Sequence, residues 1–147
     1  MIIDKQARFD WDDAITATRV STDKIDLQAN NRDLGLLDDD LYLVVMVTEA
    51  FTAAGAATLT IDLVGDDNSS LSSPTVLQNL GTTIGKATLI VGYEIFKGRL
   101  PIGKITERYL GLNYTVATGP MTAGKVRAFF TKDIDKQFYY PRGYVNY

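Results

Sequence analysis

Apolar and polar residues alternate along several short segments of the chain, a pattern that predicts strands with one buried face. The clearest segments are 58–63, 108–116 and 124–131, while 41–48 is apolar on both faces, as a covered central strand is. Further short strands are predicted, between segments rich in Gly, Asp, Asn and Ser, at 75–78, 87–91 and 93–97. Segments 15–20 and 24–27 are either two strands or one strand with a bulge. We expect 108–116 and 124–131 to pair as a C-terminal hairpin.

These strands predict an all-β fold without a convincing helix, most simply a two-sheet antiparallel sandwich of about eight strands and of the jelly-roll type. The composition agrees, because 37 of the 147 residues are Val, Ile or Thr, which favour pleated surfaces. Asp outnumbers Glu by 15 to 3, and Asp favours turns. We expect an extended N-terminal arm at 1–13, the sandwich at 14–133 and an aromatic tail at 134–147.

The chain contains no Cys and no His, which excludes disulfides, thiolate nucleophiles, Cys/His zinc sites and imidazole bases. Only carboxylate chemistry remains. The acidic turns Asp38–Asp40 and Asp66–Asn68 could offer oxygen ligands to calcium, but neither follows the EF-hand order, and such turns are common in β proteins. No pair of carboxylates has catalytic spacing. We therefore predict that the protein is not an enzyme and that it uses no cofactor or metal.

The net charge of −3 and the absence of a basic run argue against nucleic acid as a partner. The longest apolar run, Leu41–Val47, has seven residues, whereas about 20 are needed to span a bilayer, so we expect no membrane partner. The first residues lack the basic region of a signal peptide. We expect a soluble protein without a classical export signal.

Aromatic residues gather at the two ends of the chain, and four of the eight Tyr lie in the last nine residues. Tyr, Trp and Arg are enriched at interface hot spots. The candidate partner-binding residues are therefore Phe9, Trp11, Phe138, Tyr139, Tyr140, Arg142, Tyr144 and Tyr147. We expect the tail and the arm to dock on another subunit, and the alternative is a last strand folded back on its own sandwich.

Several stretches, in this order and spacing, resemble one family: 14–27, 68–77, 100–103, 108–116 and 122–126. They are similar to the jelly-roll capsid cement (decoration) proteins of short-tailed bacteriophages. The resemblance implies a structural protein on the outer surface of the virion capsid, made in the host cytoplasm. It also implies binding to the major capsid protein and bridging of its subunits by a homo-oligomer, with a dimer favoured and a trimer as the alternative.

A carbohydrate-binding jelly-roll module is the competing interpretation. Such modules stack sugars on exposed aromatic rings and often hold a structural calcium. The residues that motivate it are Trp11, Tyr93 and the acidic turns. Because one fold serves many functions, the fold alone does not separate the two interpretations.

Overall fold

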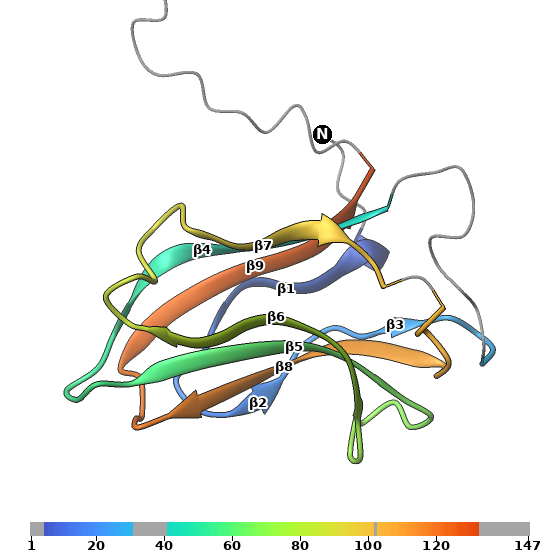
Figure 1. Ribbon diagram of the computed structural model, residues 1–147, viewed down its shortest axis with the longest axis horizontal. Coiled ribbons are helices and arrows are strands. Elements are labelled where there is room, and N and C mark those ends of the chain that lie inside the picture. Colours follow the sequence, from blue (N-terminus) through green and yellow to red (C-terminus); the bar gives the residue numbers. More distant parts are fainter. Residues whose placement is uncertain (1–4, 31–40, 102, 133–147) are drawn as a thin grey trace, which may run out of the picture.

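A computed structural model describes residues 5–30, 41–101 and 103–132, and there it confirms the predicted all-β sandwich (Figure 1). Two antiparallel sheets pack face to face, with nine strands in the described residues. Sheet A contains, in spatial order, β1 (Arg8–Ala14), β9 (Ala123–Thr131), β4 (Tyr42–Thr52) and β7 (Glu94–Arg99). Sheet B contains β2 (Arg19–Val20), β8 (Tyr109–Ala117), β5 (Thr58–Asp66) and β6 (Thr75–Gly85), with β3 (Ile25–Asp26) also paired to β8. A short 3-10 turn, Lys5–Ala7, precedes β1.

The strand pairing is that of a jelly roll. The first strand pairs with the last, β2 and β3 with β8, β4 with β7, and β5 with β6. With β2 and β3 counted as one interrupted strand, this is a long antiparallel ribbon rolled into two sheets. The predicted count of about eight strands therefore agrees with the topology.

Alternation along β5 and β8 builds the sheet B side of the core. Leu59, Ile61 and Leu63 are fully buried, as the sequence predicts, and β8 buries Leu110, Leu112 and Tyr114. From sheet A, the core receives side chains of β1, β4 and β9, namely Phe9, Leu43, Val45, Val47, Val126, Ala128 and Phe130.

The predicted C-terminal hairpin is wrong. β8 pairs with β5, β2 and β3 in sheet B, whereas β9 pairs with β1 and β4 in sheet A. Residues 118–122 therefore cross from one sheet to the other. The alternation of apolar and polar residues in each strand shows which side chains are buried. It does not show which strands pair, because two strands in opposite sheets that face the same core have the same alternation as two neighbouring strands of one sheet.

The predicted strand at 87–91 is also wrong, because this segment is a turn between β6 and β7. Leu89 is fully buried and fixes this turn to the core, but it does not belong to a strand. In contrast, β6 is longer than the predicted 75–78 and continues to Gly85. Its pairing with β5 slips register three times, so Leu77, Leu80 and Ile84 all pack on the core at spacings that break simple alternation.

The predicted N-terminal arm differs from the structure, because residues 8–14 form β1 and pair with β9 of the same sandwich. Two bulges interrupt this pairing, one between Arg8 and Asp10 and one between Trp11 and Asp13. The bulges explain why the sequence shows no steady period there.

All four outer edges of the two sheets are blunted. The edge strands β1 and β6 are bulged, β2 and β3 are two residues each, and β7 carries Glu94, Lys97 and Arg99. Bulges, short strands and charges on an edge each oppose pairing with another chain. The sandwich is thus built to make contacts with its faces and loops and not by extending its sheets.

Gly124 provides a test of the crossover into β9. Its φ is +137°, and a Cβ there would lie 2.3 Å from Cδ1 of Phe51. We expect Gly124→Ala to lower the free energy of unfolding by about 1–3 kcal/mol, measured by urea denaturation. Gly85→Ala is the matched control, since nothing lies within 4 Å of its added Cβ, and its change should stay within about 0.5 kcal/mol. Equal effects of the two substitutions would contradict this account.

Candidate functional site

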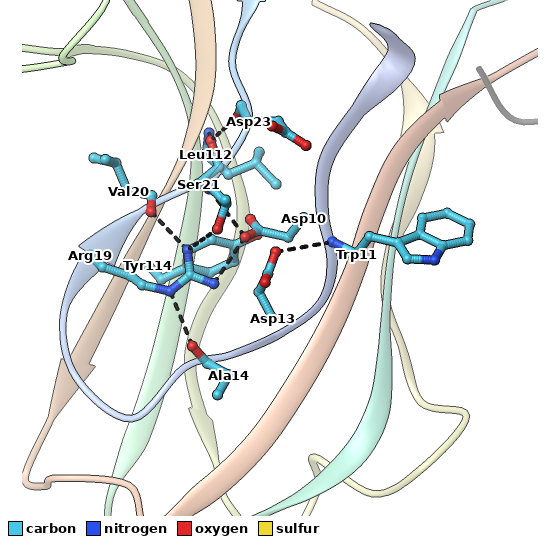
Figure 2. Close-up of polar contacts among 11 residues, drawn as sticks. Asp10, Trp11, Asp13, Ala14, Arg19, Val20, Ser21, Asp23, Leu112 and Tyr114 are labelled. Carbon is cyan, nitrogen blue, oxygen red and sulfur yellow. Dashed lines mark hydrogen bonds and ion pairs between the residues drawn. The ribbon is translucent and has the colours of Figure 1, made fainter. Parts of the chain in front are cut away.

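The two bulges in β1 set the direction of four consecutive side chains. At the first bulge, Arg8 pairs with Phe129 and Asp10 pairs with the next residue of β9, Ala128, so Phe9 is an extra residue in β1. Phe9 and Asp10 are both fully buried on the core side. In the second, Asp12 has a φ of +62°, and Trp11 and Asp12 both contact Arg127 on the outer side of sheet A. Figure 2 shows Asp10 and Trp11 extending to opposite sides of β1.

Asp10 lies at the centre of a buried polar network between the sheets. Its Oδ1 accepts hydrogen bonds from Arg19 Nη2 at 2.9 Å and from the backbone N–H of Thr22 at 3.2 Å. Its Oδ2 accepts one from the hydroxyl of Tyr114 at 2.6 Å (Figure 2). Asp10 belongs to sheet A, whereas Arg19 and Tyr114 belong to sheet B, so the network joins the two sheets.

Ser21, also buried, extends these polar contacts along sheet B. Its hydroxyl donates to the carbonyl of Asp23 at 2.8 Å and accepts from the N–H of Leu112 at 3.1 Å. The N–H of Asp23 in turn donates to the carbonyl of Phe9 at 2.9 Å. The short strands β2 and β3 are therefore held by side-chain and loop contacts as well as by their ladders.

Burial dominates the electrostatics of this network. Burial raises the pKa of Asp10, and the Tyr114 hydroxyl and the Arg19 guanidinium oppose the shift. Burial, and then the charge of Asp10, raise the pKa of Tyr114 well above its ordinary value. Each oxygen of the carboxylate already accepts hydrogen bonds within the fold, so the arrangement suits a structural tie between sheets.

Sequence reasoning did not identify Asp10, Arg19 or Tyr114 as a group. The available signal was an Asp placed between two large aromatic residues, Phe9 and Trp11, where strict alternation would give it the exposed side. Its partners follow 9 and 104 residues later in the chain, and no local pattern connects positions so far apart.

On the outer side of sheet A, Trp11 is surrounded by what we call the Trp11 cluster: Arg8, Trp11, Asp12, Arg127 and Phe129. The guanidinium carbons of Arg8 and Arg127 lie over the indole, 4.6 and 4.1 Å from the ring centroid. The ring of Phe129 is 6.1 Å from it at an angle of 57°. Phe129 is buried, whereas Trp11, Arg8 and Arg127 are partly exposed, so the cluster presents one indole and two guanidinium groups to the surroundings.

The Trp11 cluster has more positive than negative charge. Arg127 forms an ion pair with Asp12. Burial would raise the pKa of Asp12, but the hydrogen bond and charge of Arg127 outweigh it and lower that pKa. Arg8 forms no ion pair within the described residues, and its buried Nε has no hydrogen-bond partner there. The cluster therefore matches a partner that offers both apolar surface and an acceptor.

The structure separates the predicted partner-binding residues. Phe9 is fully buried and packs edge-to-face on Phe130, with ring centroids 5.0 Å apart, so the prediction that it contacts a partner fails because the first β1 bulge turns it into the core. Trp11 lies on the surface, as the prediction requires. The remaining predicted positions lie outside the described residues: Phe138, Tyr139, Tyr140, Arg142, Tyr144 and Tyr147.

The second acidic turn, Asp66–Asn68, is organised by its own hydrogen bonds. Oδ1 of Asp66 accepts from the N–H of Asn68 at 3.0 Å, and Oδ2 accepts from the N–H of Ser73 at 2.9 Å. These backbone donors, that of Ser73 first, lower the pKa of Asp66. Among the described residues, no three or more acidic side chains gather in a way that could hold a metal ion. The turn Asp38–Asp40 lies outside those residues.

Across sheet B, Asp26 and Arg108 form a surface ion pair with two hydrogen bonds of 2.8 Å. Asp26 belongs to β3, and Arg108 immediately precedes β8. The bonds from Arg108, together with the N–H of Gln28, lower the pKa of Asp26 to about 2. This pair fastens the short edge strand β3 to its neighbour.

The fold and these contacts define a jelly-roll β-sandwich protein with a sheet-bridging polar network and an aromatic, cationic outer face. The model of the Bbp16 family matches residues 9–130, and the chain therefore belongs to the Bbp16 family. No curated protein matches the chain. Within the part of the chain that is described, no helix is long and apolar enough to cross a membrane.

Removal of one donor tests the buried network. We expect Tyr114→Phe to lower the free energy of unfolding by about 1–3 kcal/mol, because Oδ2 of the buried Asp10 loses its hydrogen bond. Thermal and urea unfolding would measure the change. Tyr109→Phe is the matched control, since Tyr109 is partly exposed on the same strand, and it should unfold like the wild type. A Tyr114→Phe protein as stable as the control would show that the network does not stabilise the fold.

The Asp26–Arg108 pair predicts a pH dependence. The pKa of Asp26 is about 2 in the folded protein against 3.8 ordinarily, so its stabilisation is present above pH 3.8 and is lost as the pH falls towards about 2. We expect Asp26→Asn to be less stable than the wild type at neutral pH and the difference to shrink over this range. Urea unfolding at a series of pH values measures it. A difference that stays constant down to pH 2 would contradict the assignment.

Proposed function

We propose that this protein is a structural capsid cement protein that binds the outside of a bacteriophage head and bridges major capsid subunits. Support comes from the sequence resemblance to that family, over roughly residues 14–133, and from the jelly-roll sandwich. The observation that carries the proposal is the Trp11 cluster, an aromatic and cationic surface on the outer face of sheet A. Trp and Arg are the residues most enriched at protein interface hot spots.

A cement protein needs a body that keeps its shape under load. Here the Asp10 network ties the two sheets through Arg19 and Tyr114, and the blunted edges keep each sheet from pairing with a neighbour. Such a body transmits force between the surfaces it contacts. A rigid sandwich with blunted sheet edges is therefore suited to binding a shell that has already assembled.

Binding to the assembled shell in preference to its separate subunits stabilises the shell by linkage. Modest contacts repeated over the lattice add up through multivalency. A homo-oligomer, with a dimer favoured over a trimer, supplies the two attachment points that bridging requires. The protein acts in this role on the outer surface of the virion, without catalysis.

The carbohydrate-binding alternative has weaker support. A sugar would stack on the face of an exposed aromatic ring, but two guanidinium groups already lie over the indole of Trp11. A sugar ring would have to displace them. The contacts of this cluster therefore favour a protein partner.

Co-sedimentation tests the proposal, with empty shells assembled from the major capsid protein of the phage that encodes this chain. We expect the wild type to pellet with shells and to raise their melting temperature. Trp11→Ala should weaken binding at least about tenfold, which corresponds to 1.4 kcal/mol. Tyr109→Ala is the control, because Tyr109 also lies against an arginine, Arg108, but on sheet B.

Circular dichroism at the pelleting temperature must show both variants folded. A wild type that stays in the supernatant at all shell concentrations would refute the proposal. Binding to a glycan array by the wild type, lost in Trp11→Ala, would support the sugar-binding alternative instead.

A further inference from the structure

Four connections meet at one end of the sandwich, on the left in Figure 1: residues 14–18, 52–57, 86–93 and 117–123. We call this surface the loop end. Backbone hydrogen bonds join the four segments to each other or to the strands beside them. The N–H of Met121 donates to the carbonyl of Thr16, that of Thr122 to Thr52, and that of Lys86 to Ala57, at 2.7–3.2 Å.

The loop end lacks exposed charge. Of its 26 residues, 18 are exposed, and these are six Ala, six Thr, three Gly, Pro120, Ile90 and Val91. Its one charged residue, Lys86, is partly buried and donates to the carbonyl of Ala53. Charged residues form 22% of the whole chain, and surfaces of small domains carry roughly 25–35%. An uncharged surface of this size is characteristic of an interface centre.

The loop end also exposes two adjacent large apolar side chains. Ile90 and Val91 are 59% and 65% exposed. Their turn is fixed from both sides, because Leu89 is buried beneath it and the N–H of Gly92 donates to the carbonyl of Val47 at 2.9 Å. A rigid apolar protrusion binds a partner with little loss of conformational entropy.

We propose that the loop end is the surface on which a second copy of this chain docks. Across a two-fold axis every residue faces a surface made of the same residues, so an exposed charge near the axis would meet its own sign. The opposite end of the sandwich carries such charges, with Asp67 and Lys104 exposed and Lys24 and Glu107 partly exposed, and the loop end does not. Small side chains there let the two backbones approach closely.

The size of the loop end fits this occupant. Its 18 exposed residues approach the 20–30 residues that each partner contributes to an interface of standard size. The Trp11 cluster lies on the outer face of sheet A and is not part of the loop end. Docking of two copies through their loop ends would leave both clusters exposed, which is the arrangement that a bridging protein requires. The inference rests on the homo-oligomer of the proposed function and deepens it, because it names the surface that joins the two copies.

Light scattering and sedimentation equilibrium over a concentration series test the inference on the full chain. We expect the wild type to dimerise and Ile90→Asp to raise the dissociation constant at least about tenfold, since the new carboxylate would meet its copy in an apolar contact. Val76→Asp is the matched control. Val76 is likewise a β-branched residue, 57% exposed, but it lies on β6 outside the loop end, so that variant should dimerise like the wild type.

Several results would overturn the inference: a wild type that is monomeric at every concentration, an Ile90→Asp variant that dimerises normally, or equal losses in Ile90→Asp and Val76→Asp. Co-sedimentation separates this failure from that of the proposed function. A monomeric wild type that pellets with shells, and fails to do so after Ile90→Asp, would overturn the inference and assign the loop end to the shell, leaving binding to the shell standing without bridging by a homo-oligomer. A wild type that dimerises but does not pellet with shells would support the inference and refute the proposed function.

Discussion

The two successive inward side chains of β1, Phe9 and Asp10, form the constraint on which the rest of the structure depends. Phe9 fills the core against Phe130. Asp10 enters the same interior as a carboxylate, and a buried charge without partners costs several kcal/mol. Its partners Arg19 and Tyr114 come from the other sheet, so satisfying Asp10 fixes how the two sheets lie relative to each other. One bulge thereby couples local backbone geometry to the whole sandwich.

The same strand determines the surface that we propose as the binding face. The second bulge places Trp11 and Asp12 on the outer side, where both meet Arg127. The inner network and the outer cluster are thus held by adjacent residues, and the rigidity of one supports the geometry of the other. The loop end is ordered by hydrogen bonds between its connections, and Arg19 of the inner network also donates to the carbonyl of Ala14 within it, at 3.2 Å.

Much of the fold could be predicted from the sequence. Alternation identified β5 and β8 with their buried faces, and the excess of Asp and β-branched residues indicated a sandwich of short strands joined by turns. Prediction failed where the ladder is irregular or where partner choice is non-local. The bulges of β6 displace Leu80 and Ile84 from simple alternation, and Leu89 is buried in a turn, not a strand. Of the predicted partner-binding residues within the described part of the chain, Phe9 is buried and Trp11 is partly exposed, so only Trp11 stays a candidate.

The sequence by itself determined the all-β class, the position of most strands and the lack of Cys and His chemistry, because these follow from composition and from periods of two residues. The tertiary structure alone decided that β8 and β9 lie in different sheets, that Phe9 is buried while Trp11 is partly exposed, and that Asp10 meets Tyr114. It also decided that four uncharged connections share one end. Each of these features depends on register slips and on contacts between segments that are distant in the sequence. The free energy of those contacts arises only when the whole sandwich packs, so no local stretch of the sequence reveals them.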